Sequence, residues 1–316
     1  MAVVAWIAGQ FVPILGPAVL ALLLGASVGT LELTTVSLRP EVAFIGTRLL
    51  QASIVALGLS VDFGQVLTVA GGSLPVMLGT LGAGLLGIWL LGRLLHVEPT
   101  IRGLLAVGTS VCGASAIAAV APVLEADPQE IAYAVAVVFL FNVAAVIIFP
   151  TIGHAFGFST ATFAVWAGTA VNDTSSVLAA SFAFGAGAAT FAAVVKLSRT
   201  VMILPITIGI ALLRRDERRG GWRDRAGAAF RRALPWFIVA FLVAALAHSA
   251  GLVPPPVAQA AGTIAQLGTV AALAAIGLGT DLQAVRRAGA RPLLLGGAGW
   301  LLVATTSLGL QALTQR

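Results

Sequence analysis

Long apolar stretches, separated by short charged or Pro/Gly-containing breaks, dominate this sequence. About 20 apolar residues are enough for a helix to cross the hydrocarbon core of a bilayer. Eleven stretches meet or approach that length, the first of them shortened: 2–12, 14–30, 44–60, 64–91, 100–123, 129–151, 157–184, 187–213, 233–250, 255–280 and 290–313. The pattern predicts an all-α polytopic membrane protein that forms a single integral membrane domain over residues 1–316, with ten or eleven transmembrane helices.

The composition agrees with this prediction. Hydrophobic residues make up 59% of the chain and charged residues only 9%, whereas a soluble domain has about 25% charged residues. So few charges cannot cover a water-facing surface, which excludes a soluble globular enzyme. The single cysteine also excludes a disulfide framework within the chain and a cysteine-cluster metal site.

The basic residues fall on alternate loops. In the eleven-span order, fourteen of them lie on one side, in four predicted loops: 31–43, 92–102, 214–232 and 281–291. The other side has Arg316 as its only basic residue and receives four acidic ones: Asp62, Glu125, Asp127 and Glu130. The positive-inside rule therefore predicts a cytoplasmic N-terminus. We interpret the eight arginines of loop 214–232 as a topology anchor beside anionic membrane lipid, rather than as a nucleic-acid site.

One internal similarity joins the ends of two predicted helices. Gly58-Leu59-Ser60-Val61-Asp62 resembles Gly277-Leu278-Gly279-Thr280-Asp281. In the eleven-span order these two segments run in opposite directions, as the halves of an inverted repeat do. The sequence therefore predicts an inverted repeat.

A second similarity relates residues 108–115, Gly-Thr-Ser-Val-Cys-Gly-Ala-Ser, to residues 168–175, Gly-Thr-Ala-Val-Asn-Asp-Thr-Ser. Both segments interrupt an apolar span with small and polar residues. Irregular backbone at membrane depth is tolerated where it lines a cavity or is buried in protein, and paired broken helices form the substrate site of many secondary transporters. Two discontinuous helices are therefore expected, running in the same direction in the eleven-span order. Small-residue helix packing is the alternative explanation.

Beyond the first three residues of each predicted span, four charged side chains lie inside spans: Arg48, Asp173, Lys196 and Arg199. Each costs about 2.5–3.5 kcal/mol at a helix centre, so such residues usually pair, line water or bind a ligand. Three cations and one carboxylate favour an anionic substrate. One arrangement pairs Asp173 with Lys196 or Arg199, and this pair is either part of the site or purely structural. Arg48 lies near a span end, where snorkelling is the alternative.

Residues 111–119, 170–176 and 195–199 together resemble the bacterial YeiH-type family, whose members are described as sulfate exporters, and residues 277–281 and 291–296 resemble it as well. The resemblance implies an inner-membrane carrier with inverted repeats and two discontinuous helices that cross at mid-membrane. It also implies a distant similarity to the folds of sodium–proton antiporters and bile-acid transporters. Many relatives have histidine where this chain has Asn172.

We therefore expect a secondary active transporter of a small anion, such as sulfate or an organosulfonate, that works by alternating access. The expected substrate-binding residues are Arg48, Thr109, Ser110, Cys112, Gly113, Ser115, Asn172, Asp173, Thr174, Ser175, Lys196 and Arg199. Asp173 and Lys196 are the expected coupling residues. Neither cofactor nor metal is expected, and a homodimer is compatible with the implied fold. The main alternative is a cation–proton antiporter with Asp173 as cation ligand. A membrane-embedded enzyme or a sensor is disfavoured, because the sequence shows no catalytic dyad and no signalling domain.

Overall fold

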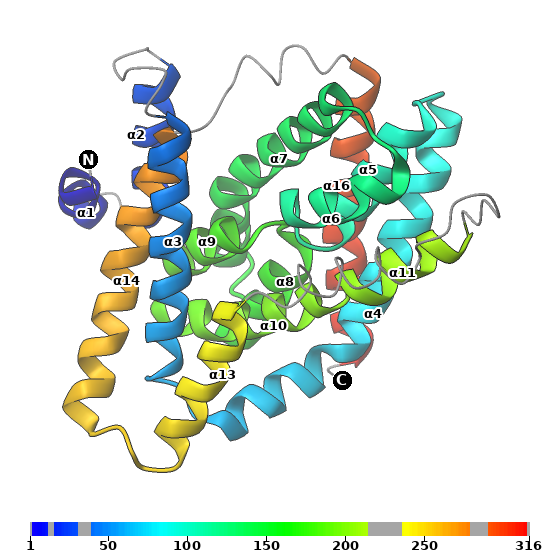
Figure 1. Cartoon of the computed structure of the whole chain (residues 1–316). Coiled ribbons are helices and arrows are strands. Elements are labelled where there is room, and N and C mark those ends of the chain that lie inside the picture. Colours follow the sequence, from blue (N-terminus) through cyan, green and yellow to red (C-terminus); the bar gives the residue numbers. More distant parts are fainter. Residues whose placement is uncertain (1, 12–15, 31–38, 214–235, 279–289, 315–316) are drawn as a thin grey trace.

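The computed structural model describes residues 2–11, 16–30, 39–213, 236–278 and 290–314, and every regular element in these ranges is a helix (Figure 1). The helices are α1 (Ala2–Phe11), α2 (Gly16–Thr30), α3 (Arg39–Gly58), α4 (Phe63–Leu94), α5 (Pro99–Ser110), α6 (Ala114–Leu124), α7 (Pro128–Ala155), α8 (Thr160–Ala170), α9 (Thr174–Phe184), α10 (Ala186–Val201), α11 (Ile203–Leu213), α13 (Trp236–Ser249), α14 (Pro255–Leu278) and α16 (Ala290–Thr314). Among the described residues, five helical segments are long and apolar enough to cross a membrane: Phe63–Leu94, Pro128–Ala155, Gly187–Ile210, Pro255–Leu278 and Ala290–Thr314. The all-helical prediction is confirmed. The arginine-rich loop 214–232 lies outside the described residues.

Helices α3 and α14 pack side by side in opposite directions, with α2 and α13 against them (Figure 1). Gly46, early in α3, meets Ala275, late in α14, and Ser53 meets Gly268 further along the pair. A Cβ atom on Gly268 would lie 2.3 Å from Ser53 Oγ, so glycine is what permits this close approach.

Helices α4 and α16 form a second antiparallel pair, at the opposite side of the molecule in Figure 1. Gly84 contacts Val303, and Gly92, near the end of α4, contacts Leu295, near the start of α16. Helices α7 to α10 lie between the two pairs, so each pair forms one flank of a central group (Figure 1).

The predicted spans 100–123 and 157–184 are not single transmembrane helices. Each is a helical hairpin whose two arms run antiparallel. In hairpin 1, formed by α5 and α6, a Cβ on Gly103 would lie 2.9 Å from Leu124. In hairpin 2, formed by α8 and α9, the rings of Phe163 and Phe184 stack with centroids 3.9 Å apart. Residues that far apart in sequence would be separated by about 30 Å along a continuous helix.

Local conformation explains why the chain reverses. Gly113 has φ +68°, in the region that only glycine adopts without strain, and Asp173 caps the start of α9. The breaks were predicted correctly. The prediction that each chain continues past its break as a crossing transmembrane helix is wrong. The hydropathy of a hairpin is similar to that of a broken span, so the two cannot be told apart from the sequence.

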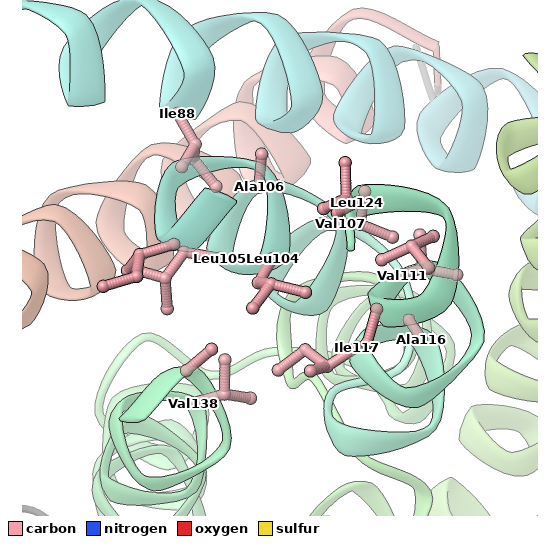
Figure 2. Packing of buried hydrophobic residues seen from close by; sticks show 14 of the residues in the cluster. Ile88, Leu104, Leu105, Ala106, Val107, Val111, Ala116, Ile117, Leu124 and Val138 are labelled. Carbon is pink, nitrogen blue, oxygen red and sulfur yellow. The ribbon is translucent and has the colours of Figure 1, made fainter. Parts of the chain in front are cut away.

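The arms of hairpin 1 are held by a tightly packed apolar cluster (Figure 2). Leu104 and Leu105 from α5 and Ile117 from α6 are buried against Val138 of α7 and Ile88 of α4. Between membrane helices, close packing of this kind rather than removal from water provides the attraction. The hairpin is therefore fixed to its neighbours along its length, and its tip is held in place.

The two hairpins enter the molecule from opposite ends. Helix α7 begins directly after hairpin 1 and leads into hairpin 2, and at 28 residues it is about 42 Å long. Gly153, near its end, contacts Phe163 and Phe184 at the base of hairpin 2. The expectation that the two similar segments share one direction is therefore wrong. Residues 125–130 lie at the same end of the molecule as Arg93 and Arg102. The prediction that the acidic residues of this segment are on the other side of the membrane from these arginines is therefore wrong.

Candidate functional site

The tips of the two hairpins meet. Each tip starts at the C-cap of the first arm, Val111 or Val171, and ends at the N-cap of the second arm, Gly113 or Asp173. These positions correspond in the two similar segments. A Cβ on Gly113 would lie 3.4 Å from Asp173 Cβ, so the tips are in van der Waals contact.

Lys196 of α10 connects both tips. Its Nζ donates to the carbonyl oxygens of Val111 and Val171, each at 2.8 Å, and the side chain is fully buried. These carbonyls are at the C-terminal ends of α5 and α8, where the helix dipoles carry partial negative charge. One ammonium group therefore stabilises two helix ends that arrive from opposite directions.

Arg199 lies one turn further along α10 and is also fully buried. Its Nη2 donates to the carbonyl oxygen of Ser110. Its Nε and Nη1 have no hydrogen-bond partner among the described residues. The guanidinium therefore retains donors beside the tip of hairpin 1.

Asp173 is the N-cap of α9 and is half-buried. Its Oδ1 accepts from the Ser176 backbone N–H at 2.9 Å and from the Ser175 hydroxyl, and its Oδ2 accepts from the Ser176 hydroxyl at 2.6 Å. Within the described chain no ion pair joins Asp173 to Lys196 or Arg199, so the arrangement that paired them is wrong. The Asp173 carboxylate is satisfied by its role as the cap of α9. Lys196 and Arg199 instead donate hydrogen bonds to carbonyl oxygens at the helix ends.

The other predicted residues divide into three groups. Thr109, Ser110 and Cys112 are buried at the end of hairpin 1, and Gly113 forms its turn. Asn172 is buried in the tip of hairpin 2. Three residues are accessible at the tips, with Ser115 exposed and Thr174 and Ser175 half-buried.

Arg48 does not belong to this site. Its guanidinium lies 5.1 Å from the centroid of the Phe44 ring and donates to Gln51 at 3.4 Å, on an exposed face of α3. This position fits the snorkelling alternative, because the aliphatic stem of an arginine reaches toward the interface from a span end.

Sequence reasoning missed two polar residues, one that contacts the tip of hairpin 2 and one that contacts the last turn of α8 beside it. Asn142, in the middle of α7, accepts a hydrogen bond from the Asn172 backbone N–H at 3.0 Å, and its amide also faces Gly113. Ser307 of α16 lies 2.7 Å from the Thr169 hydroxyl. A carboxamide in a long apolar run was a readable signal for Asn142. Ser307 stood among other small residues and offered none.

The comparisons with known proteins identify the family. The profile of the family "Conserved hypothetical protein 698" matches residues 1–296. A UPF0324 membrane protein of Streptococcus agalactiae is 36% identical over 320 residues, which cover 99% of this chain and 94% of that protein. A UPF0324 membrane protein of Fusobacterium nucleatum is 33% identical over 331 residues, which cover 98% and 94%. No solved structure matches the chain.

These matches extend over nearly the whole chain and confirm the expected YeiH-type relationship. The relatives are membrane proteins, in agreement with the apolar helices of the fold. The chain is a member of the UPF0324 family of multi-pass membrane proteins.

Proposed function

We propose that this protein is a secondary active transporter of a small anion, and that the anion binds at the meeting hairpin tips. The balance of charge carries this proposal. Two helix C-termini and two helix N-termini meet at the tips, so their partial charges offset one another. Among the described residues, Lys196 and Arg199 outnumber the carboxylate of Asp173 at the tips, and this excess of positive charge favours an anion.

Unpartnered polar atoms at the tips support an oxyanion. The Ser110 hydroxyl, both amide atoms of Asn172 and two nitrogens of Arg199 are buried without a hydrogen-bond partner among the described residues. Each such group costs about 1–3 kcal/mol when it stays unsatisfied. Sulfate or a sulfonate offers several strong acceptor oxygens to the donors in this set, which are the Ser110 hydroxyl, Asn172 Nδ2 and the two Arg199 nitrogens. This agrees with the substrate class implied by the family resemblance.

The exposed side of the tips supplies an approach for the anion. Helix α6 begins at Gly113 without a side-chain cap, and Ser115 in its first turn is exposed. Helix α9 begins beside it. Backbone N–H groups at helix N-termini are common anion ligands. In the proposed cycle the anion reaches these N-termini and the Ser115 hydroxyl first.

Opposed packing of matching elements supports alternating access. Three pairs of elements run in opposite directions: α3 with α14, α4 with α16, and hairpin 1 with hairpin 2. We interpret these pairs as an inverted repeat with permuted order, in which α3, α4 and hairpin 1 correspond to α14, α16 and hairpin 2. Exchange of the two halves around the tips would open the site to each end in turn.

Asp173 is the proposed coupling residue. Its carboxylate caps α9 through three hydrogen bonds from Ser175 and Ser176. Protonation would weaken this cap and alter the tip of hairpin 2, which links proton binding to the geometry of the anion site. Lys196, which holds both tips, would transmit the change between the hairpins.

A thermal-shift screen of the purified protein against sulfate, methanesulfonate, chloride and sodium tests the substrate class. Sulfate or the sulfonate should raise the melting temperature of the wild type and of Arg48→Gln, the matched control outside the site. The shift should be absent in Asn172→Ala. Stabilisation by sodium alone, with no effect of any anion, would favour the cation–proton antiporter instead.

A further inference from the structure

Two arginines flank one exposed tryptophan near the end of α4. The Arg93 guanidinium carbon lies 5.9 Å from the centroid of the Trp89 ring, and that of Arg102 lies 5.1 Å from it. Arg93 belongs to the last turn of α4, whereas Arg102 comes from the first turns of α5, at the base of hairpin 1. This arginine–tryptophan cluster therefore joins two separate helices.

Local packing positions the Arg102 side chain. A Cβ on Gly92 would lie 2.6 Å from Arg102 Cγ and 2.7 Å from its Cδ, so only glycine lets the stem cross α4 toward Trp89. Arg102 Nε is buried without a hydrogen-bond partner among the described residues. The conformation is thus held by the backbone of α4, with its charged group beside the ring.

The two arginines of the cluster have no ion-pair partner within the described residues. No carboxylate of the described residues forms an ion pair with Arg93 or Arg102. Two guanidinium groups that share one ring repel each other, and this repulsion is relieved by an anion between them. Phosphate is well suited, because guanidinium groups donate paired hydrogen bonds to its oxygens.

The surface next to the cluster is apolar. Leu86, about one turn before Trp89 on α4, is 62% exposed, and Leu90, directly after Trp89, is 46% exposed. Exposed leucines with a tryptophan and arginines at the helix end are the arrangement of a membrane interface, where acyl chains adjoin phosphate headgroups. Free phosphate has no apolar group that could contact the exposed leucines, whereas a phospholipid has acyl chains.

We propose that the arginine–tryptophan cluster binds the phosphate of an anionic phospholipid and so links α4 to the base of hairpin 1. The lipid's acyl chain lies along Leu86 and Leu90. This site is separate from the hairpin tips, and the proposal does not depend on what the protein transports.

Quenching of Trp89 by brominated lipid tests the proposal in nanodiscs. The chain has six tryptophans, so the difference between the wild type and Trp89→Phe isolates the Trp89 signal. Phosphatidylglycerol with brominated acyl chains should quench this signal more than brominated phosphatidylcholine at the same mole fraction. In Arg93→Gln/Arg102→Gln, measured against the same change with Trp89→Phe added, the preference should fall by about 30-fold, given the usual contribution of a surface arginine to binding anionic lipid.

Arg48→Gln is the matched control, because Arg48 also lies against an aromatic ring, that of Phe44, and no second arginine of the described residues lies over that ring. It should keep the full preference for phosphatidylglycerol. Equal quenching by both lipids in the wild type, or a preference that survives in Arg93→Gln/Arg102→Gln, overturns the proposal. Loss of the preference on addition of inorganic phosphate, but not of sodium chloride at equal ionic strength, assigns the cluster to free phosphate and overturns the lipid assignment.

Discussion

Val111 and Val171 occupy equivalent positions in two hairpins that enter from opposite ends of the molecule, and their carbonyl oxygens accept from the same Lys196 ammonium at 2.8 Å each. This relationship makes Lys196 the point where the two hairpins are joined. A buried cation is normally expensive. Here its desolvation is offset by two helix C-termini that would otherwise leave buried carbonyls without donors.

Replacing Lys196 by Met should lower the stability of the protein. Both carbonyl oxygens lose a charge-assisted hydrogen bond, and each unsatisfied buried acceptor costs about 1–3 kcal/mol. We expect a loss of about 2–5 kcal/mol after partial relaxation, measured as a lower melting temperature in nanodiscs. Arg48→Met is the control and should stay within about 0.5 kcal/mol of the wild type, as exposed substitutions usually do. Equal melting temperatures for Lys196→Met and Arg48→Met would show that Lys196 does not hold the two hairpins together.

Two substitutions of Asp173 should separate its capping role from its proposed coupling role. Asp173→Ala removes the cap of α9 and should cost about 1 kcal/mol, whereas Asp173→Asn retains an acceptor for the Ser176 N–H and should be close to the wild type in stability. An amide cannot take up a proton, so if Asp173 is the coupling residue, Asp173→Asn should transport with a flattened pH profile. Full pH-dependent transport by Asp173→Asn in proteoliposomes would contradict the coupling role.

Gly113→Ala should destabilise hairpin 1. Its φ of +68° is strained for any residue with a Cβ, and that Cβ would contact Asp173 at 3.4 Å; the expected cost is about 1–2 kcal/mol. Gly82→Ala provides a matched control in the same chain, because Gly82 is within α4 and a Cβ there would meet nothing within 4 Å. That substitution should be neutral or stabilising by up to about 1 kcal/mol. Melting temperatures of the two variants decide the comparison.

Asp62 should contribute to stability in a pH-dependent way. The Ser249 hydroxyl donates to its carboxylate at 2.9 Å and the Gln65 N–H donates at 3.1 Å, and these bonds lower the pKa of Asp62 from its usual 3.8. Because the folded pKa is the lower one, the stabilisation is complete above the unfolded pKa and is lost as the pH falls through the folded pKa. Ser249→Ala should therefore be less stable than the wild type at pH 6. The difference should shrink progressively below pH 3.8, where thermal melts at stepped pH values would reveal it.

Much of the candidate site was readable from the sequence. Polar breaks in apolar runs located both tips, and the scarcity of membrane charges singled out Lys196 and Arg199, which the structure buries at hairpin 1. The reversal of the chain was not readable, because the contact of Gly103 with Leu124 and that of Phe163 with Phe184 are tertiary. Hydropathy reflects burial in lipid or protein, and it does not show whether the chain continues or reverses at a break.

The errors about charge have a similar origin. A count of charges within spans treats Arg48 and Arg199 alike, although one is exposed beside Phe44 and the other is fully buried. The same count suggested an ion pair for Asp173, because it ignored backbone groups. At a helix break the partners are the carbonyl and N–H groups of the helix ends, and these have no signature in composition.

Counterflow of radiolabelled sulfate in proteoliposomes tests the central claim most directly. Wild-type protein and Arg48→Gln should exchange external labelled sulfate for internal unlabelled sulfate or sulfonate, and Asn172→Ala should lose this exchange while remaining folded. Exchange by Asn172→Ala at the wild-type rate would contradict the placement of the site at the hairpin tips. An absence of exchange with every small anion tried, together with sodium–proton exchange by the same vesicles, would contradict anion transport itself.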